Sequence, residues 1–347
     1  MIKRNRIGRG FIVCLAILTG IGLWKTVPGR SPGVTTFVHA PQGIMGTTCT
    51  LAVATGARNE ERARESLVDA ERTLRAIEAR MSSWLDDSEI SRLNRATGSE
   101  EIPLSPQSCQ VLRAALQAEA QTNGAFDVTC RPLIELWSKA ARRGRLPTAA
   151  EIDAARSESS CGLIEVMDGG AVKHAAEARV DLGGIAKGYG IDQAVAVLRH
   201  SWMNGGLVDV GGDLFCFGSP DGEQYWSVEV KNPFGENPLG QLHLRDRAAC
   251  TSGNYARYTT IEGERYSHIV DPRTGWPSTG VPSVTVVSSS AMVADIWATA
   301  LSVLGEDGLA LLPDGVEALM VLGTAEDYRF VTTPGMPPFL VPTGNSK

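Results

Sequence analysis

Several common sequence signals are missing from this chain of 347 residues. Its seven cysteines form no Cys-x-x-Cys pair, which excludes the usual zinc and dithiol redox motifs. No basic stripe follows the first 30 residues and the net charge is −6, so nothing indicates a nucleic-acid partner. No internal repeat is present. The composition, with 43% hydrophobic and 21% charged residues, is ordinary for a globular protein.

Residues 1–30 have the features of an export signal. Four basic residues precede the apolar run Phe11–Trp24, which is shorter than the about 17–25 residues that a spanning helix needs. The small-x-small pattern at 38–40 lies far downstream, and Pro41 disfavours cleavage there. We therefore favour an uncleaved signal-anchor over a cleaved signal peptide, with a buried helix as a third interpretation. The body is expected on the periplasmic side of the inner membrane, after a linker over 31–44. One disulfide is possible there, but its connectivity cannot be deduced from the sequence.

Helical and strand patterns mix without regular alternation along the body. Apolar spacing and capping signals predict helices over 60–81, from 106 to about 123, from about 149, over 185–199 and over 292–304. Strand patterns occupy 48–55, 205–218, 225–233 and 283–290. We predict an α+β fold with mixed or antiparallel sheets and flanking helices, in two intimate subdomains. The domain is expected over 45–335, and a tail over 336–347.

The stretch "VDLGGIAKGYGID", residues 180–192, places an acid, glycines and a lysine on one turn. It lacks the Gly-Lys-Ser/Thr end of a phosphate loop, because Gly188 follows Lys187. Lys187 at a helix start favours a phosphate nearby. Asp181 would repel a phosphate and is expected to bond a sugar, a ring N–H or a backbone donor. A plain strand–turn–helix is the structural alternative.

Two further constellations carry oxygen and nitrogen ligands. Asp295 and Thr299 share a helical face and could supply hard oxygen ligands to Mg²⁺. The alternative is that Asp295 simply favours the dipole of its helix. His268, three residues before Asp271, is a candidate general base or hydrogen-bond donor to a pyrophosphate, although a lone histidine is more often structural.

Together, eight ordered segments of the chain resemble the ApbE family, the FAD:protein FMN transferases. The resemblance runs from about Met45 to Gly305. The segments are "MGTT", "MSSWLDDSEISRLNR", "GAFDVTCRPLIELW", "DLGGIAKGYGID", "VDVGGDL", "TSGNYARY", "SHIVDPRTGWP" and "SVTVVSSSAMVADIWATALSVLG".

The resemblance implies an ApbE-like architecture, related to the T-fold, and an exported enzyme. Such an enzyme cleaves the pyrophosphate of FAD, attaches FMN through a phosphoester to a threonine of a target protein and releases AMP. The target would be a protein such as a subunit of a membrane electron-transfer complex. The alternatives are a Mg²⁺-dependent FAD pyrophosphatase, which would use the same residues, and a non-catalytic flavin-binding protein. The presence of both Asp295 and Thr299 argues against the last of these.

The resemblance also implies roles for individual residues. Those implied to contact FAD are Met45, Trp84, Ala125, Phe126, Asp127, Asp181, Lys187, His268 and Ile269, with Trp84 stacked on the flavin. Mg²⁺ would be held by the backbone oxygen of Gly184, by Asp295, by the backbone of Ala298 and by Thr299. His268 or Asp271 would take the proton of the acceptor hydroxyl.

Three positions depart from the family pattern. Trp84 stands where tyrosine is more frequent, and Gly184 where alanine or threonine is frequent. A backbone ligand at Gly184 survives that change. Asp209 stands where asparagine is frequent, and the sequence offers no account of the added charge.

Overall fold

The computed structural model describes residues 25–28, 33–220, 225–253 and 258–342. Most of the predicted signal-anchor over 1–30, part of the segment "TSGNYARY" and the last five residues of the predicted tail lie outside this part. Among the described helices, none combines the length and apolar character needed to cross a membrane. The six cysteines of the described residues are free thiols.

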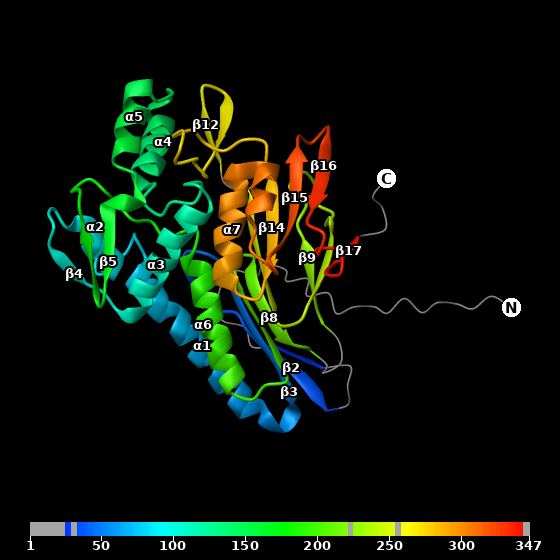
Figure 1. The fold of residues 1–347 in the computed structure, drawn as a ribbon. Coiled ribbons are helices and arrows are strands. Elements are labelled where there is room, and N and C mark those ends of the chain that lie inside the picture. The colour runs from blue at the N-terminus through cyan, green and yellow to red at the C-terminus, as the bar shows by residue number, and fades with distance from the viewer. Residues whose placement is uncertain (1–24, 29–32, 221–224, 254–257, 343–347) are drawn as a thin grey trace.

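The fold is built on a nine-stranded antiparallel sheet, in the order β1-β2-β3-β7-β8-β11-β14-β15-β16 (Figure 1). Its strands are β1 (Lys25–Pro28), β2 (Val34–His39), β3 (Cys49–Gly56), β7 (Gly205–Val210), β8 (Asp213–Gly218), β11 (Arg247–Gly253), β14 (Ser283–Ser288), β15 (Glu317–Gly323) and β16 (Tyr328–Thr332). Strand β2 pairs with β3 along its whole length. Residues 31–44, predicted as a linker, therefore supply a strand of the main sheet.

Three smaller sheets complete the strand content of the described residues. They comprise β9 (Trp226–Val230), β10 (Gly240–Leu244) and β17 (Leu340–Pro342); β12 (Tyr258–Ile261) and β13 (Glu264–Ser267); and β4 (Glu101–Pro103), β5 (Ile164–Met167) and β6 (Gly170–Lys173). Strand β17 pairs with β10, and Met336 is fully buried. The chain from Met336 to Pro342, predicted as part of a tail, is thus part of the folded body.

The α-helices are α1 (Glu60–Met81), α2 (Glu89–Arg95), α3 (Pro106–Gln121), α4 (Arg131–Arg143), α5 (Ala149–Ser157), α6 (Ala186–His200) and α7 (Ala291–Leu304), with 3₁₀ turns at Ala57–Asn59, Cys161–Leu163 and Gly305–Leu311. The capping predictions are confirmed. The hydroxyl of Ser105 accepts from the N–H of Ser108, and Thr148 and Glu151 form a capping box. Helices α2 and α4 were not predicted from the sequence.

The main sheet lies between two layers. Helices α1, α6 and α7 cover one face (Figure 1), where they form the largest hydrophobic core with inward residues of β7, β8, β11 and β14. The opposite residues of these strands pack against β9 and β10 in a second core. Alternation of side chains along each strand produces both cores. The predicted α+β class, with flanking helices, is confirmed.

A third, smaller core lies at one end of the molecule, where α4, α5 and β12 gather (Figure 1). It contains Trp137 of α4, Ala155 of α5, Ile261 of β12 and Val270. Because Val270 follows His268 closely in the sequence, this core carries the segment with the candidate base.

Candidate functional site

The first turns of α6 and α7 touch, and a glycine makes the contact possible. A Cβ atom on Gly188 would lie 2.3 Å from the carbonyl oxygen of Ala291, so a larger residue would separate the helices. One turn further along α6, the carboxylate of Asp192 accepts from the backbone N–H groups of Ala291 at 2.7 Å and Met292 at 3.0 Å. It thereby caps α7. This crossing sets Lys187 beside Asp295.

A buried charge cluster occupies this crossing, formed by Lys187, Asp213 and Asp295. The ammonium of Lys187 makes ion pairs with Asp213 and, at 3.5 Å, with Asp295 Oδ1. The two carboxylates are only 3% and 2% exposed. Backbone N–H groups also donate to them, from Gly188 to Asp295 Oδ2 at 3.0 Å and from Thr251 to Asp213 Oδ1 at 3.0 Å. Two buried carboxylates therefore share one cation.

Burial and mutual charge shift the pKa values of Lys187 and Asp295. Burial alone would lower the pKa of Lys187, but the charges of Asp295 and Asp213 outweigh it and raise that pKa. Burial raises the pKa of Asp295 above its ordinary value, and Asp213 adds to this shift while Lys187 opposes it. The cluster carries one more negative than positive charge, which favours an additional cation nearby.

The oxygen donors predicted for Mg²⁺ lie next to this cluster. A Cβ atom on Gly184 would be 2.9 Å from the hydroxyl oxygen of Thr299, so the turn before α6 faces α7 one turn beyond Asp295. The carbonyl oxygen of Ala298 already accepts from the Ser302 hydroxyl at 2.9 Å. The described residues contain no group of three His, Cys, Asp or Glu side chains suited to a metal. A carboxylate, a hydroxyl and carbonyl oxygens fit Mg²⁺, which usually completes its shell with water or phosphate.

Met45 and Phe126 border the same region. Met45 lies in a tight turn with φ 49°, and its Cε is 2.7 Å from the position of a Cβ on Gly190 of α6. A ring atom of Phe126 is 3.1 Å from the position of a Cβ on Gly184. The glycines of α6 and of the turn before it thus make room for neighbouring protein groups.

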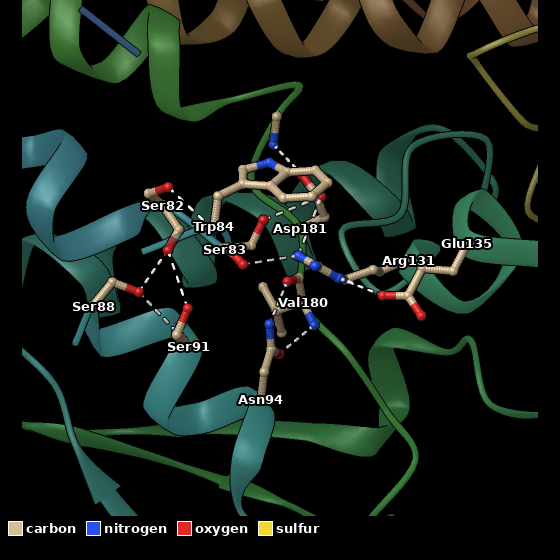
Figure 2. A network of polar contacts seen from close by, with 11 residues as sticks. Ser82, Ser83, Trp84, Ser88, Ser91, Asn94, Arg131, Glu135, Val180 and Asp181 are labelled. Atoms are coloured by element: carbon tan, nitrogen blue, oxygen red, sulfur yellow. Dashed lines mark hydrogen bonds and ion pairs between the residues drawn. The ribbon is translucent and has the colours of Figure 1, made fainter. Parts of the chain in front are cut away.

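Two predicted residues, Trp84 and Asp181, lie with Arg131 where the loop 82–88, the start of α4 and the turn after Val180 meet (Figure 2). Trp84 is 80% exposed, and the guanidinium of Arg131 lies 5.0 Å from the centre of its ring. The carboxylate of Asp181 accepts from the Ser83 hydroxyl at 3.3 Å and from the Gly183 N–H at 2.8 Å. We call Trp84, Arg131 and Asp181 the aromatic shelf.

The backbone before Asp181 is held by Asn94 of α2. The Asn94 amide donates to the carbonyl of Val180 at 2.8 Å and accepts from its N–H at 2.7 Å (Figure 2). Because Asp181 is adjacent, this double hydrogen bond fixes its place. The turn from Asp181 to Gly184 then connects the aromatic shelf to the buried cluster.

The segment Ala125–Asp127 lies shortly before Arg131 in sequence and is largely committed to its own turn. Ala125 and Phe126 are buried. Asp127 Oδ1 accepts from the N–H and the hydroxyl of Thr129, each at 2.6 Å, and from the thiol of Cys161 at 3.1 Å. The carboxylate of Asp127 is therefore a turn-forming group.

The predicted candidates for proton transfer differ in their surroundings. His268 is exposed and Ile269 is half-buried. Both carboxylate oxygens of Asp271 accept from the guanidinium of Arg273 at 2.9 Å, and one also accepts from the Arg273 N–H. This engagement organises the turn and argues against the base role predicted for Asp271. Arg273 also lies beside Gly124, with 3.6 Å between its Cγ and the position of a Cβ on that glycine.

Comparison with known proteins connects this arrangement to one family. A profile described as the ApbE family matches residues 45–320. The chain belongs to the ApbE family. It is 34% identical to a FAD:protein FMN transferase of Vibrio cholerae over 279 residues, covering 78% of this chain and 84% of that protein. It is 30% identical to one of Salmonella typhimurium over 329 residues, covering 91% and 94%.

Solved ApbE structures have the same fold. The flavin transferase ApbE from Vibrio cholerae superposes with a TM-score of 0.76 at 28% identity, covering 92% of this chain and 99% of that one. The ApbE protein from Thermotoga maritima superposes with a TM-score of 0.77 at 28% identity, over the same shares of the two chains.

Two charged residues of this ApbE chain escaped the sequence analysis. Asp213 lies in the segment "VDVGGDL", where only Asp209 attracted attention, and Arg131 lies in "GAFDVTCRPLIELW" without a predicted role. Their partners, Lys187 and Trp84, are distant in sequence. The only feature of the nearby sequence that pointed to Asp213 was the pair Gly211-Gly212 directly before it.

Asp209 receives a structural explanation. Its Oδ1 accepts from the N–H of Gly212 at 2.8 Å and closes the turn between β7 and β8. Burial raises its pKa to about 6, and the nearby charge of Asp213 adds to the rise. An asparagine could accept the same hydrogen bond without the charge, which explains why either residue suits this turn.

Proposed function

We propose that this ApbE-family protein transfers FMN from FAD to a threonine hydroxyl of a target protein and releases AMP. The observation that carries the proposal is the link between an exposed aromatic shelf and a buried, oxygen-rich charge cluster through the single turn from Asp181 to Gly184. A flat ring and a pyrophosphate of one FAD molecule require these two environments side by side. The relatives named FAD:protein FMN transferase support the same conclusion.

In this proposal FAD spans both parts of the site. Trp84 stacks on the isoalloxazine ring, and Asp181 accepts hydrogen bonds from polar groups of the flavin half. Further contacts with FAD come from Met45, Ala125, Phe126, Asp127 and Lys187, and on the pyrophosphate and adenosine side from His268 and Ile269.

Mg²⁺ would be held by the carbonyl oxygens of Gly184 and Ala298, the carboxylate of Asp295 and the hydroxyl of Thr299. When bound, the ion supplies positive charge that neutralises the pyrophosphate oxygens. Lys187 adds a point charge on the same side, and its position is fixed by Asp213 and Asp295. Its ammonium is therefore anchored to protein carboxylates before any phosphate arrives.

The transfer itself is a substitution at phosphorus. The threonine oxygen of the acceptor forms a bond to the phosphorus atom of the FMN half. The bond from that phosphorus to the bridging oxygen breaks, and AMP leaves with that oxygen. The threonine proton goes to His268, which is exposed and so accessible to an incoming protein chain.

The location and the partner follow from the N-terminal sequence. The basic and apolar residues of 1–30 favour export, with the body held at the periplasmic side of the inner membrane by an uncleaved anchor. The acceptor would then be an exported or membrane protein, such as a subunit of an electron-transfer complex.

One experiment separates the candidate functions. The purified body is incubated with FAD, Mg²⁺ and a candidate acceptor domain, and the products are separated under denaturing conditions. Fluorescent flavin that stays on the denatured acceptor, with an equal amount of AMP, supports the transferase. Free FMN and AMP without labelled acceptor would indicate a pyrophosphatase instead. Tight binding of FAD without AMP release would indicate a flavin-binding protein.

A further inference from the structure

Trp84 carries a large, exposed indole on a loop whose backbone is held by hydrogen bonds. Its loop is tied at both ends: the Ser88 hydroxyl donates to the Ser82 carbonyl at 2.6 Å, and the Trp84 N–H donates to the Ser82 hydroxyl at 3.2 Å. These bonds fix the backbone and leave the side-chain torsions of Trp84 open. An exposed tryptophan with free torsions would lose rotamer entropy when a ligand stacks on it.

Arg131 restricts the side chain of Trp84, which the loop does not, because it contacts the ring itself. Its guanidinium lies 5.0 Å from the ring centre, within the range of a cation–π interaction. The same side chain donates from Nη1 to the Ser83 carbonyl at 3.2 Å and from Nε to Glu135 at 2.9 Å. Its Nη1 also lies 3.8 Å from Asp181 Oδ2. Four groups therefore hold one guanidinium in a fixed orientation.

The two side chains differ in exposure, which indicates that Arg131 holds Trp84 and not the reverse. Trp84 is 80% exposed, whereas the side chain of Arg131 is only 15% exposed. The arginine is thus the fixed partner and the indole the open one. With a cation against one part of the ring, the remaining surface of the indole is presented to solvent and to a flat ligand.

We propose that Arg131 is a positioning residue for flavin binding, which orients Trp84 as a stacking surface before FAD arrives. This inference rests on the proposed function, since it takes the flavin ring as the ligand of Trp84. It requires the guanidinium, because the single ammonium of a lysine cannot contact the ring and bond both Ser83 and Glu135 in the same geometry. Arg131 acts through Trp84 and makes no bond that changes during the transfer.

A purely structural role for Arg131 leads to different expectations. Arg131 and Glu135 form an i,i+4 pair at the start of α4, which by itself would stabilise only that helix. Loss of such a pair would lower the melting temperature without altering the affinity of the folded protein for FAD. The two roles can therefore be distinguished by binding measurements on folded variants.

The test compares Arg131→Met, Arg131→Lys, Trp84→Ala and the double variant Trp84→Ala/Arg131→Met in the full chain. Arg92→Met is the matched control, since Arg92 donates to the Asp87 carbonyl of the same loop at 2.9 Å. FAD affinity is measured by calorimetry without acceptor, and KM and kcat are measured with acceptor. We expect Arg131→Met and Arg131→Lys to raise Kd and KM about 5-fold with kcat nearly unchanged.

The double variant decides whether Arg131 acts through the indole. If it does, Arg131→Met adds little to the loss caused by Trp84→Ala. Additive losses, restoration of affinity by lysine, or an equal loss in Arg92→Met would overturn the inference. Failure of the wild-type protein to label an acceptor, with FAD binding intact, would instead contradict the proposed function alone.

Discussion

The buried charge cluster and the aromatic shelf lie at opposite ends of one short turn, yet they are built differently. Lys187, Asp213 and Asp295 are bonded to one another and to backbone N–H groups. Trp84, by contrast, presents most of its surface to solvent. A closed cluster permits few alternative arrangements, and a change there should affect the rate. In the proposed function the open shelf meets the flavin directly, so a change there should affect affinity.

The largest effect is expected from Asp295→Asn, which would break the cluster. Asparagine can still accept from the Gly188 N–H but cannot supply the negative charge. We expect kcat for AMP release to fall at least about 100-fold, with FAD affinity changed by less than about 3-fold. Chelation of Mg²⁺ from the wild-type protein should cause a loss of the same size. Normal turnover of the variant, measured by chromatography of AMP, would contradict the metal assignment.

A smaller effect is expected from Asp213→Asn, which removes one of the two partners of Lys187. The variant keeps an acceptor for the Thr251 N–H, so the fold should persist. Because Asp213 holds the ammonium of Lys187 in place, we expect kcat to fall by about 10-fold. The measurement is steady-state AMP release at saturating FAD. A change confined to KM would show that the cluster and the shelf are not functionally distinct.

Removal of the ring at the shelf should have the opposite kinetic signature. Trp84→Ala is expected to raise KM for FAD by about 10-fold while kcat changes little, since stacking contributes to binding rather than to the bond that breaks. Trp84→Tyr is the matched control and should retain most of the affinity. A drop in kcat equal to that of Asp213→Asn would show that the shelf and the cluster do not have separate kinetic roles.

The smallest effect is expected from Asp209→Asn, which tests through stability the cost of burying a carboxylate near the cluster. The pKa of Asp209 is raised to about 6, so its ionised form destabilises the fold. Stability should decline as the pH rises from about 4 to about 6 and then level off. We expect Asp209→Asn to add about 1–2 kcal/mol at pH 7, with no gain near pH 4. Urea unfolding at both pH values measures this, and parallel pH profiles would contradict it.

The sequence predicted those parts of the structure that depend on neighbours along the chain. Helix α1 matches its predicted bounds of 60–81, and the cap at Thr148 is present, because both depend on residues a few positions apart. Strand β2 was missed because residues 31–44 contain turn-forming residues, and its pairing with β3 is a tertiary contact. Local patterns do not report such pairing.

In the site, too, residues close in sequence were predicted and contacts between distant residues were not. Asp295 and Thr299 were found because they are one helical turn apart. The partnership of Lys187 with Asp213 and Asp295 spans 26 and 108 residues, and the contact of Arg131 with Trp84 joins a loop to the start of another helix. These pairs depend on where the sheet and helices bring the chain. The role of Gly188 in the contact with α7 likewise depends on a residue distant in sequence, Ala291.

That contact between α6 and α7 determines when the site is assembled. With Gly188 against Ala291 and Asp192 capping α7, docking of the two helices brings Lys187 and the oxygen donors of α7 into register. The conformational entropy lost in gathering these groups is therefore lost once, during folding, and not in every catalytic cycle. The distance between the starts of α6 and α7 depends on the absence of a Cβ atom at Gly188. Through this preorganisation, that distance should influence the turnover of the enzyme.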